Sequence, residues 1–451
     1  MSQNGHKPFL SVVIPTHNRR DVLIRILEAL FSQDYPQERL QVVVVLDDCT
    51  DDTELALNAL NPPVSLEYLC LPKVGQAAAR NKGIRQSVGD LIVFLDDDVE
   101  PAPGFLRAHA SAHSPADNLV VQGYYPFSRQ LKRHLHMLSA SRWWERHFER
   151  LGQPGRKLGP CDLCTGNLSV RREHLMAVGG FDEAFGGYGN EDYELGWRLS
   201  IHGLEFRFCR EALGWHHYAT PLSKSLMRTR EEARADVTYG RKYPHLKRSF
   251  RLFTLTQERS ISRTLIRALA FQFPKLGDRI ASRLLKLMYP LERLGLRGTW
   301  TRINWTLRRY YYWRGITDSL GSYRALKEYL GNDWVKHPAK TRTRVTGIDL
   351  QNEAAVIEGL EGYEAAYILV KNGARPLSWL WMRSADGWLG PSQIKEAIEA
   401  QAWAGVTRGG VEGVRLMRAF LPSIIPVQIS GRPRPLSEQA QKVELNELSW
   451  R

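Results

Sequence analysis

Long apolar runs and cysteines are both scarce in this chain of 451 residues. No stretch reaches the ~18 uninterrupted apolar residues that a membrane-spanning helix needs. The opening residues MSQNGHKPFL lack the charged and apolar segments of a secretion signal. The 5 cysteines are an odd and sparse set, which argues against a disulfide framework and suits a reducing compartment. We therefore expect a cytoplasmic protein.

The composition is otherwise that of an ordinary soluble protein, with 43% apolar and 24% charged residues. It excludes a collagen-like, a wholly disordered or a disulfide-scaffold protein. Basic residues exceed acidic ones by 14, and between Pro221 and Val345 alone 28 Lys and Arg stand against 9 Asp and Glu. This local excess predicts that the middle of the chain lies against something anionic.

The anionic partner of this basic segment is open to more than one interpretation. Two of its stretches place cationic side chains beside apolar or aromatic ones, Ile280–Met288 and Asn304–Arg314. Lys and Arg near an anionic leaflet, with Trp and Tyr at the interface, would hold the protein at the inner face of the cytoplasmic membrane. A solvated helical bundle explains the pattern nearly as well. A polyanion-binding protein is a further alternative, but it leaves three acidic loops unexplained, so no nucleic-acid partner is expected.

Short apolar runs alternate with helix-length amphipathic segments from Phe9 to about Ala219, which is typical of an α/β fold with a doubly wound, mostly parallel sheet. The apolar content of the strands predicts burial on both faces. The predicted strands are Leu10–Ile14, Gln41–Leu46, Ser65–Cys70 and Asp90–Leu95, and the predicted crossover helices are Arg19–Gln33, Asp51–Leu60 and Gly75–Ser87.

Four segments are expected along the chain. Residues 1–222 form the sheet domain, and residues 223–344 form a basic, mainly helical segment. Residues 345–430 form a small α/β module, with strands at Ala366–Val370 and Leu380–Met382 and a helix near Ser392–Ala402. The tail, residues 431–451, is expected to be mobile because it is rich in charge and contains two prolines.

Three consecutive aspartates, Asp96, Asp97 and Asp98, follow the fourth predicted strand. Ligands bind at the carboxyl ends of strands in such sheets, and neighbouring carboxylates repel one another unless a cation neutralises them. Oxygen ligands favour Mg²⁺ or Mn²⁺. The alternative is an acidic turn that caps a helix beginning near Pro103, but the position after a central strand favours the metal site.

Two polar residues suit a nucleotide: Asp48, after the second predicted strand, and Arg80, in the predicted helix Gly75–Ser87. The carboxylate of Asp48 can accept hydrogen bonds from a base or a ribose, while the neighbouring Asp51 caps a helix. Arg80 offers a cation toward a phosphate, although an exposed helix arginine is about equally consistent with the sequence.

A second acidic site lies in the glycine-rich stretch Gly186–Leu199. Glu191 and Asp192 are expected in the first turn of a helix, where the helix dipole favours acidic residues and keeps a carboxylate ionised as a base. Downstream, the imidazole of His216 or His217 is a further metal ligand candidate, although a histidine pair is more often structural.

These motifs, taken together and in order, resemble the family 2 inverting glycosyltransferases of the GT-A fold. The resemblance covers roughly residues 9–230 and depends on the stretches Val12–Arg19, Leu46–Thr53, Phe94–Asp98, Gly166–Arg172, Gly179–Asp182 and Gly189–Asp192. The Gly-x-Gly-x-x-Gly signature is absent, which argues against an oxidoreductase built on a similar sheet.

The resemblance implies a role for each candidate residue. A nucleotide-sugar donor would lie against Pro15, Asn18 and Asp48, with Arg80 near its base or phosphates and Asp96 at its ribose. Asp98 and His216, which is preferred over His217, would bind Mn²⁺ or Mg²⁺; Asp97 matches a variable position. Asp192 matches the general base and Glu191 its acidic neighbour.

The expected reaction moves a sugar, with inversion, from the donor to a saccharide or lipid-linked hydroxyl acceptor, in the synthesis of cell-surface polysaccharide or glycolipid. A nucleotidyltransferase is the nearest rival enzyme, because it too would use carboxylate-bound metal and a nucleotide pocket. The other alternative is a membrane- or polyanion-binding protein whose GT-A-like domain is not catalytic.

Overall fold

A computed structural model gives the architecture of the chain. It describes residues 7–331, except 115–116, 129–133, 157, 245–246, 248–250 and 258–259, and a second set comprising 343–350, 357, 365–372, 375–383, 389 and 393–398. Two compact units are present, one built mainly from residues 1–336 and the other mainly from residues 337–403. The predicted mobile tail lies outside the described residues.

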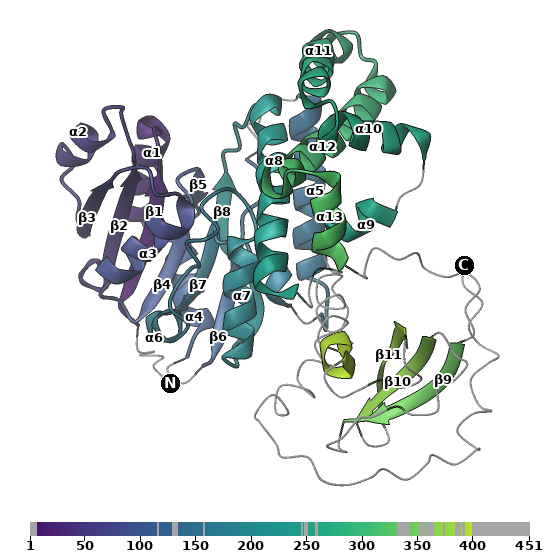
Figure 1. Ribbon diagram of the computed structural model, residues 1–451. Helices are drawn as coiled ribbons and strands as arrows, with labels where there is room; N and C mark the ends of the chain where they lie inside the picture. Colours follow the sequence, from purple (N-terminus) through teal and green to yellow (C-terminus); the bar gives the residue numbers. More distant parts are fainter. Residues whose placement is uncertain are drawn as a thin grey trace. The chain divides into compact units, whose positions relative to one another are not determined.

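An eight-stranded mixed sheet forms the centre of the first unit (Figure 1), with the strand order β3-β2-β1-β4-β7-β6-β8-β5. The strands are β1 Leu10–Thr16, β2 Leu40–Asp47, β3 Ser65–Leu71, β4 Leu91–Leu95, β5 Val99–Pro101, β6 Leu119–Tyr124, β7 Asn167–Arg171 and β8 Glu205–His216. The pairs β3/β2, β2/β1, β1/β4 and β6/β8 are parallel, and β4/β7, β7/β6 and β5/β8 are antiparallel. All four predicted strands are present, and the α/β class is confirmed.

Burial differs between the central strands and the edge. β1 and β4 are buried along their whole length, as parallel strands covered on both faces must be. β3 is only half-buried, with Ser65 and Cys70 exposed, so the prediction of burial on both faces is wrong for this strand. Its place at the end of the sheet explains the difference, because one side of an edge strand has no neighbouring strand.

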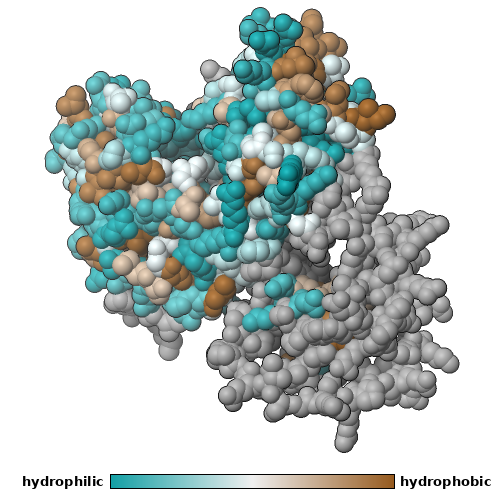
Figure 2. Space-filling model, in the orientation of Figure 1, coloured by the Kyte–Doolittle hydropathy of each residue, from teal (hydrophilic) through white to brown (hydrophobic). Residues whose placement is uncertain are grey.

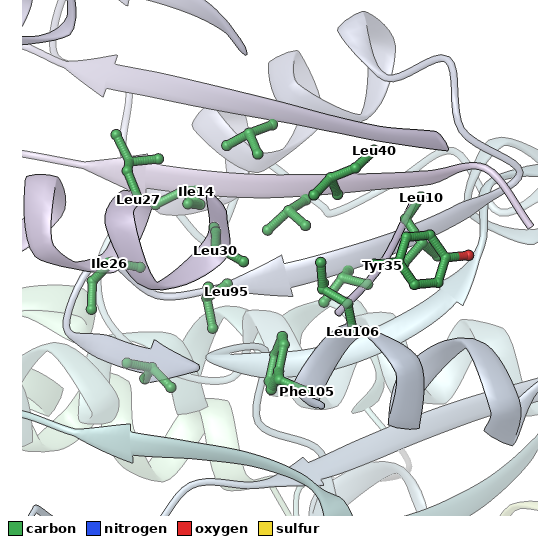
Figure 3. Packing of buried hydrophobic residues seen from close by; sticks show 14 of the residues in the cluster. Leu10, Ile14, Ile26, Leu27, Leu30, Tyr35, Leu40, Leu95, Phe105 and Leu106 are labelled. Carbon is green, nitrogen blue, oxygen red and sulfur yellow. The ribbon is translucent and has the colours of Figure 1, made fainter. Parts of the chain in front are cut away.

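Helices cover the sheet and fix its core. α1 Arg20–Phe31 places Leu23, Ile26, Leu27 and Leu30 on its buried face, at the spacing of an amphipathic helix. Figure 3 labels Ile26, Leu27 and Leu30 of this face, which pack in one cluster with Ile14 and Leu95 of the central strands and with Phe105 of α4. The remaining helices of the sheet domain are α2 Thr53–Asn58, α3 Gln76–Gln86, α4 Phe105–Ala112, α5 Leu135–Leu151, α6 Arg172–Ala177 and α7 Glu191–Ile201, with short 3₁₀ turns at Gln37–Arg39 and Pro160–Asp162.

The basic segment is helical throughout its described part, as predicted. Its helices are α8 Leu222–Lys242, α9 Arg251–Gln257, α10 Ile261–Phe271, α11 Pro274–Arg293, α12 Arg297–Leu320 and α13 Tyr323–Leu330. They have a core of their own, in which Tyr310, Tyr312 and Trp313 of α12 are almost fully buried. The expectation of Trp and Tyr at a membrane interface is therefore wrong for these three aromatic residues, because they form the centre of the bundle.

The second unit contains the predicted strands within a three-stranded sheet of order β11-β10-β9. These strands are β9 Thr343–Asp349, β10 Ala365–Asn372 and β11 Arg375–Arg383, and residues 393–398 are helical. No helix among the described residues is long and apolar enough to cross a membrane.

Candidate active site

Four of the predicted site residues lie in loops at the carboxyl ends of neighbouring strands: Asn18, Asp48, Asp96 and Asp98. β1 pairs in parallel with both β2 and β4, so the loops that follow these three strands meet at one edge of the sheet. Arg19 demonstrates the convergence, because its guanidinium, after β1, reaches the carboxylates after β4. Pro15 is buried within β1.

The aspartates after β4 are paired rather than capping. Nη1 of Arg19 lies 2.6 Å from Oδ1 of Asp97 and 2.7 Å from Oδ2 of Asp98. The following helix, α4, begins after Gly104 and receives no side-chain cap. The alternative of an acidic helix cap is therefore wrong, and the cluster is held by a cation of the protein.

Asp98 faces His216, as the metal prediction requires. Nε2 of His216 lies 3.3 Å from Oδ1 of Asp98, whereas His217 binds the carboxylate of Glu100 at 2.7 Å. Burial alone would raise the pKa of Asp98, but His216 and Arg19 lower it below its ordinary value. Asp98 is therefore held as a carboxylate with one oxygen on Arg19 and the other beside an imidazole nitrogen.

The middle aspartate, Asp97, has a structural role. Its second oxygen accepts a hydrogen bond of 2.8 Å from Oγ1 of Thr16, so both oxygens are occupied by protein groups. Burial raises its pKa to about 6, against the opposing charge of Arg19. Asp97 thus fixes Arg19 and the end of β1 without reaching solvent.

The loop after β2 contains two neighbouring carboxylates with different surroundings, Asp47 and Asp48. Asp47 accepts hydrogen bonds from the backbone N–H groups of Val74 and Gly75, at 2.6 and 3.0 Å, and thereby shapes the entry to α3. Asp48 is exposed, has a φ of 58°, and makes no side-chain contact within the described part of the chain. Asn18 holds this loop in place, since its Oδ1 accepts hydrogen bonds from the N–H groups of Thr50 and Asp51.

Arg80 connects the two acidic sites. Its side chain is only 3% exposed, so the alternative of an exposed helix arginine is wrong. Nη2 lies 3.0 Å from Oδ1 of Asp96, and Nη1 lies 3.5 Å from Oε1 of Glu191. The guanidinium also lies over the ring of Phe181, while its Nε has no hydrogen-bond partner among the described atoms.

Glu191 and Asp192 occupy the first turn of α7, as predicted. Glu191 is buried, and burial together with the charge of Asp192 raises its pKa to about 7. Asp192 accepts hydrogen bonds from Oγ1 and N of Thr165, at 2.6 and 3.2 Å. Burial raises the pKa of Asp192, and the charge of Arg80 opposes that rise.

The two acidic sites meet around Tyr125 and Gly166. The ring of Tyr125 contacts the His216 ring, with 5.8 Å between centroids, and burial raises the pKa of its hydroxyl, with smaller contributions from Cys164, Asp96 and Asp192. A Cβ on Gly166 would lie 2.7 Å from Oδ2 of Asp96 and 3.1 Å from the Tyr125 hydroxyl. Gly166 is therefore the position where lack of a side chain lets the two sites approach.

A family match supports this arrangement. Residues 11–179 match the family described as glycosyl transferase family 2, and residues 146–219 match the family described as the N-terminal domain of galactosyltransferase. The similarity to glycosyl transferase family 2 thus covers most of the sheet domain. The two matched segments contain every candidate site residue named above, from Pro15 to His216.

Curated relatives match about the same share of this chain. Validoxylamine A glucosyltransferase of Streptomyces hygroscopicus subsp. jinggangensis is 34% identical over 47% of this chain and 56% of its own length. Chondroitin synthase of Escherichia coli is 25% identical over 46% of this chain and 34% of its own length. The chain thus spans about half the length of the first of these relatives. Among solved structures, the mannosyltransferase PcManGT from Pyrobaculum calidifontis, in complex with GDP-Man and Mn²⁺, has 19% identity and a TM-score of 0.45, covering 70% of this chain and 88% of that one.

The helical segment supports the loop that leads into α7. Nδ2 of Asn190 donates a hydrogen bond of 2.7 Å to Oδ1 of Asp236 on α8, and the hydroxyl of Tyr312 on α12 donates to the other oxygen of Asp236. Asn190 does not cap α7 with its side chain. Instead it is held at a φ of 67°, directly before Glu191.

A cavity of about 420 Å³ adjoins the site. His217, Tyr218 and Ala219 line one side of it, and α5, α8 and α11 supply most of the rest, with His134, His136, Met137, Pro221, Leu222, Met288, Tyr289 and Glu292. The cavity thus begins one residue beyond His216.

Three contributions to the candidate site were missed from the sequence. Arg19 and Thr165 lie within or beside quoted motifs, yet their spacing gives no sign that they bind Asp98 and Asp192. Asp236 was missed because it lies 46 residues beyond Asn190, on a helix expected to be part of a separate segment.

Proposed function

We propose that the chain is an inverting glycosyltransferase that moves a sugar from a nucleotide-diphosphate donor to a hydroxyl acceptor. One observation carries the proposal: two carboxylates with opposite pKa shifts, Asp98 and Asp192, are linked through Tyr125, whose ring contacts the Asp98 partner His216 and whose hydroxyl pKa is raised by burial and by the charge of Asp192. Carboxylates whose environments separate their pKa values are typical of sites where one group binds a cation and the other exchanges a proton.

Asp192 is the general base in this proposal. Its carboxylate takes the proton from the acceptor hydroxyl while the oxygen forms a bond to the anomeric carbon. The bond from that carbon to the donor diphosphate breaks on the opposite face, and its electron pair leaves with the diphosphate. Inversion follows because attack and departure occur on opposite faces. Thr165 orients the base through its hydrogen bonds of 2.6 and 3.2 Å.

Asp98 and His216 would hold the divalent cation. Two ligand atoms at adjacent corners of an octahedral Mg²⁺ site lie about 3 Å apart, and Oδ1 of Asp98 lies 3.3 Å from Nε2 of His216. No set of three His, Cys, Asp or Glu side chains suited to a metal is present among the described residues, so phosphate oxygens and water would supply the remaining ligands. When bound, the cation would offset the charge that develops on the leaving diphosphate.

The donor would lie along the loops after β1, β2 and β4. Exposed Asp48 is available to a base or ribose, because the hydrogen bonds that hold its loop are made by Asp47 and Asn18. Asp96, whose side chain is 32% exposed, is available to the ribose on one side while Arg80 holds its other oxygen. Arg80 itself is buried, which favours an indirect effect on the phosphates through Asp96.

The acceptor would enter from the cavity beside His217. Tyr218 and Tyr289 offer aromatic faces, and the histidines and Glu292 offer hydrogen bonds to hydroxyl groups. A saccharide or lipid-linked saccharide fits this lining. The name of the relative chondroitin synthase supports a role in polysaccharide synthesis, and we extend this to cell-surface polysaccharide or glycolipid.

The test is a panel of nucleotide sugars incubated with the full chain and Mn²⁺, with and without saccharide acceptors. Release of nucleoside diphosphate is expected for at least one donor. Release of pyrophosphate instead would identify a nucleotidyltransferase, and absence of any turnover or donor binding across the panel would favour a non-catalytic domain.

A further inference from the structure

An exposed apolar row runs along α11, outside the active site. Leu276, Ile280, Leu287 and Leu294 are separated by 4, 7 and 7 residues, so they lie on one side of the helix. Their side chains are 50, 36, 44 and 71% exposed. The core face of the same helix is formed by other residues, including Ala281, Met288 and Leu291. This apolar row therefore contributes little to holding α11 in the bundle.

A basic row runs beside it, one residue earlier at each position. Lys275, Arg279, Lys286 and Arg293 repeat the same separations and are all exposed. None of the four has an ion pair in the part of the chain that the structure describes. Because one residue corresponds to about 100° of helix rotation, the basic row lies directly next to the apolar row.

The acidic side chains of α11 are turned toward the protein. Asp278 accepts a hydrogen bond of 2.7 Å from the Tyr310 hydroxyl and pairs with Arg314 at 3.2 Å. Glu292 accepts a hydrogen bond of 2.6 Å from the N–H of Leu135. Positive charge on the outer side of α11 is thus not offset by the acidic groups of the helix.

The two rows extend for about 30 Å, since an α-helix rises about 1.5 Å per residue. α10 adds further exposed apolar side chains, Ile261 at 92% and Leu265 at 59%. Figure 2 shows apolar and hydrophilic residues side by side at the end of the molecule where Figure 1 places α10 and α11.

We propose that the α11 rows dock the enzyme on the surface of an anionic lipid bilayer. A helix with an apolar side next to a row of Lys and Arg is suited to lie in the interface, with its apolar side chains among the acyl chains and its cations at the headgroups. A second copy of this chain fits less well, because it would bring its own unpaired basic row to the contact. Tyr310, Tyr312 and Trp313 of α12 take no part in this docking, since they are buried.

Docking through α11 would also bring the cavity close to the membrane. The same helix supplies Met288, Tyr289 and Glu292 to the cavity that begins at His217. If the proposed function is correct, a lipid-linked acceptor would have a short path from the bilayer to the catalytic carboxylates. The docking itself does not depend on the proposed function.

The test is flotation of the full chain with vesicles of phosphatidylcholine alone or with 30% phosphatidylglycerol, at low and high salt. Binding is expected only to the anionic vesicles and is expected to fall at high salt. The variant Arg279→Glu/Lys286→Glu is expected to bind about tenfold less at low salt. Ile280→Ser/Leu287→Ser is expected to lose the binding that remains at intermediate salt.

Matched controls come from the sheet domain. Lys82→Glu/Arg85→Glu makes the same charge change at exposed positions of α3, and Leu55→Ser removes an exposed apolar residue of α2. Both are expected to bind vesicles like the parent chain. Donor hydrolysis in solution is measured for every variant, and unchanged hydrolysis with lost flotation separates docking from catalysis.

Three results would overturn the docking proposal. One is absence of flotation with anionic vesicles at low salt, and another is equal loss in the row variants and the controls. The third is a dimer in sedimentation analysis that Ile280→Ser/Leu287→Ser dissociates, which would show that a second copy covers the apolar row.

Discussion

Each of the two acidic sites places an arginine near two neighbouring carboxylates, but the pKa of Asp98 is lowered and that of Asp192 is raised. At the end of β4, Arg19 touches both Asp97 and Asp98; at the start of α7, Arg80 contacts Glu191 and reaches Asp192 only through space. With a guanidinium 2.7 Å away and His216 opposite, Asp98 has a lowered pKa. Asp192, without a direct cation, has a raised pKa. Asp97 lies 2.6 Å from the same guanidinium and still has a raised pKa, so pairing with Arg19 alone does not decide the direction of the shift. The charge of His216 is the largest influence that lowers the pKa of Asp98.

This difference assigns separate tasks to the two sites. A carboxylate with a lowered pKa is suited to bind a cation at every physiological pH, and one with a raised pKa is suited to accept a proton during the reaction. Arg80 links the two sites, because it contacts Asp96, in the proposed donor site, and Glu191, beside the proposed base.

The largest effect is expected from removal of the base. Asp192→Asn keeps the shape of the side chain but cannot accept the proton, so turnover is expected to fall by about 10²- to 10⁴-fold. Initial rates of nucleoside diphosphate release measure this loss. The matched control Asp21→Asn changes an exposed acid on α1 and is expected to leave the rate unchanged; a rate within threefold of the parent for Asp192→Asn would contradict its assignment as base.

Removal of the cation ligand is expected to have the next largest effect. Asp98→Asn weakens the proposed cation site, so donor affinity in the presence of Mn²⁺ is expected to fall at least about tenfold, while binding without metal changes little. Isothermal titration of the donor, with and without Mn²⁺, measures the difference. Glu100→Gln, on the neighbouring strand β5, serves as the control because Glu100 binds His217 and not His216.

A side chain at Gly166, between Asp96 and Tyr125, is expected to lower both the stability of the protein and its affinity for the donor. In Gly166→Ala the added methyl group would meet Oδ2 of Asp96 at 2.7 Å, so a loss of stability of about 1–3 kcal/mol is expected from overpacking. Donor affinity is expected to fall with it. Denaturant unfolding and donor titration test this, with Gly298→Ala as the control, because a Cβ at Gly298 has no neighbour within 4 Å. Parent-like stability and affinity for Gly166→Ala would show that the sites do not meet there.

The smallest effect is expected from replacement of Thr165, which donates hydrogen bonds to the proposed base Asp192. The hydrogen bonds of Thr165 lower the pKa of Asp192, so Thr165→Val, which removes the hydroxyl, should raise that pKa further. Because only the ionised carboxylate accepts a proton, activity would then be lost at a higher pH as the solution is acidified. The pH profile of kcat/KM measures this shift, and Thr165→Ser, which keeps the hydroxyl, should restore the parent profile. An unchanged profile for Thr165→Val would separate Thr165 from the base.

The sequence predicted the strands and the site loops well, because both depend on local pattern. Apolar runs such as Leu10–Ile14 determine buried strands, and the carboxylates after them must emerge at one sheet edge. Local pattern could not predict which of Asp47 and Asp48 turns inward, because that choice depends on the N–H groups of Val74 and Gly75 from a later loop.

Long-range contacts account for the other failures. The exposure of β3 follows from its place at the sheet edge, and the burial of Tyr310, Tyr312 and Trp313 follows from helix packing within the basic segment. Neither feature is encoded in the hydropathy of its own residues. The same holds for Asp236, which accepts a hydrogen bond from Asn190. This contact joins α8, which lies beyond the predicted sheet domain, to the loop before α7.

The most direct measurement of the divided tasks compares three proteins in parallel: the parent chain, Asp98→Asn and Asp192→Asn, each in a thermal-shift screen of nucleotide sugars with and without Mn²⁺. The account predicts that the parent and Asp192→Asn show the same Mn²⁺-dependent stabilisation by one donor, and that Asp98→Asn shows none. Donor stabilisation that survives in Asp98→Asn, or that disappears in Asp192→Asn, would contradict it.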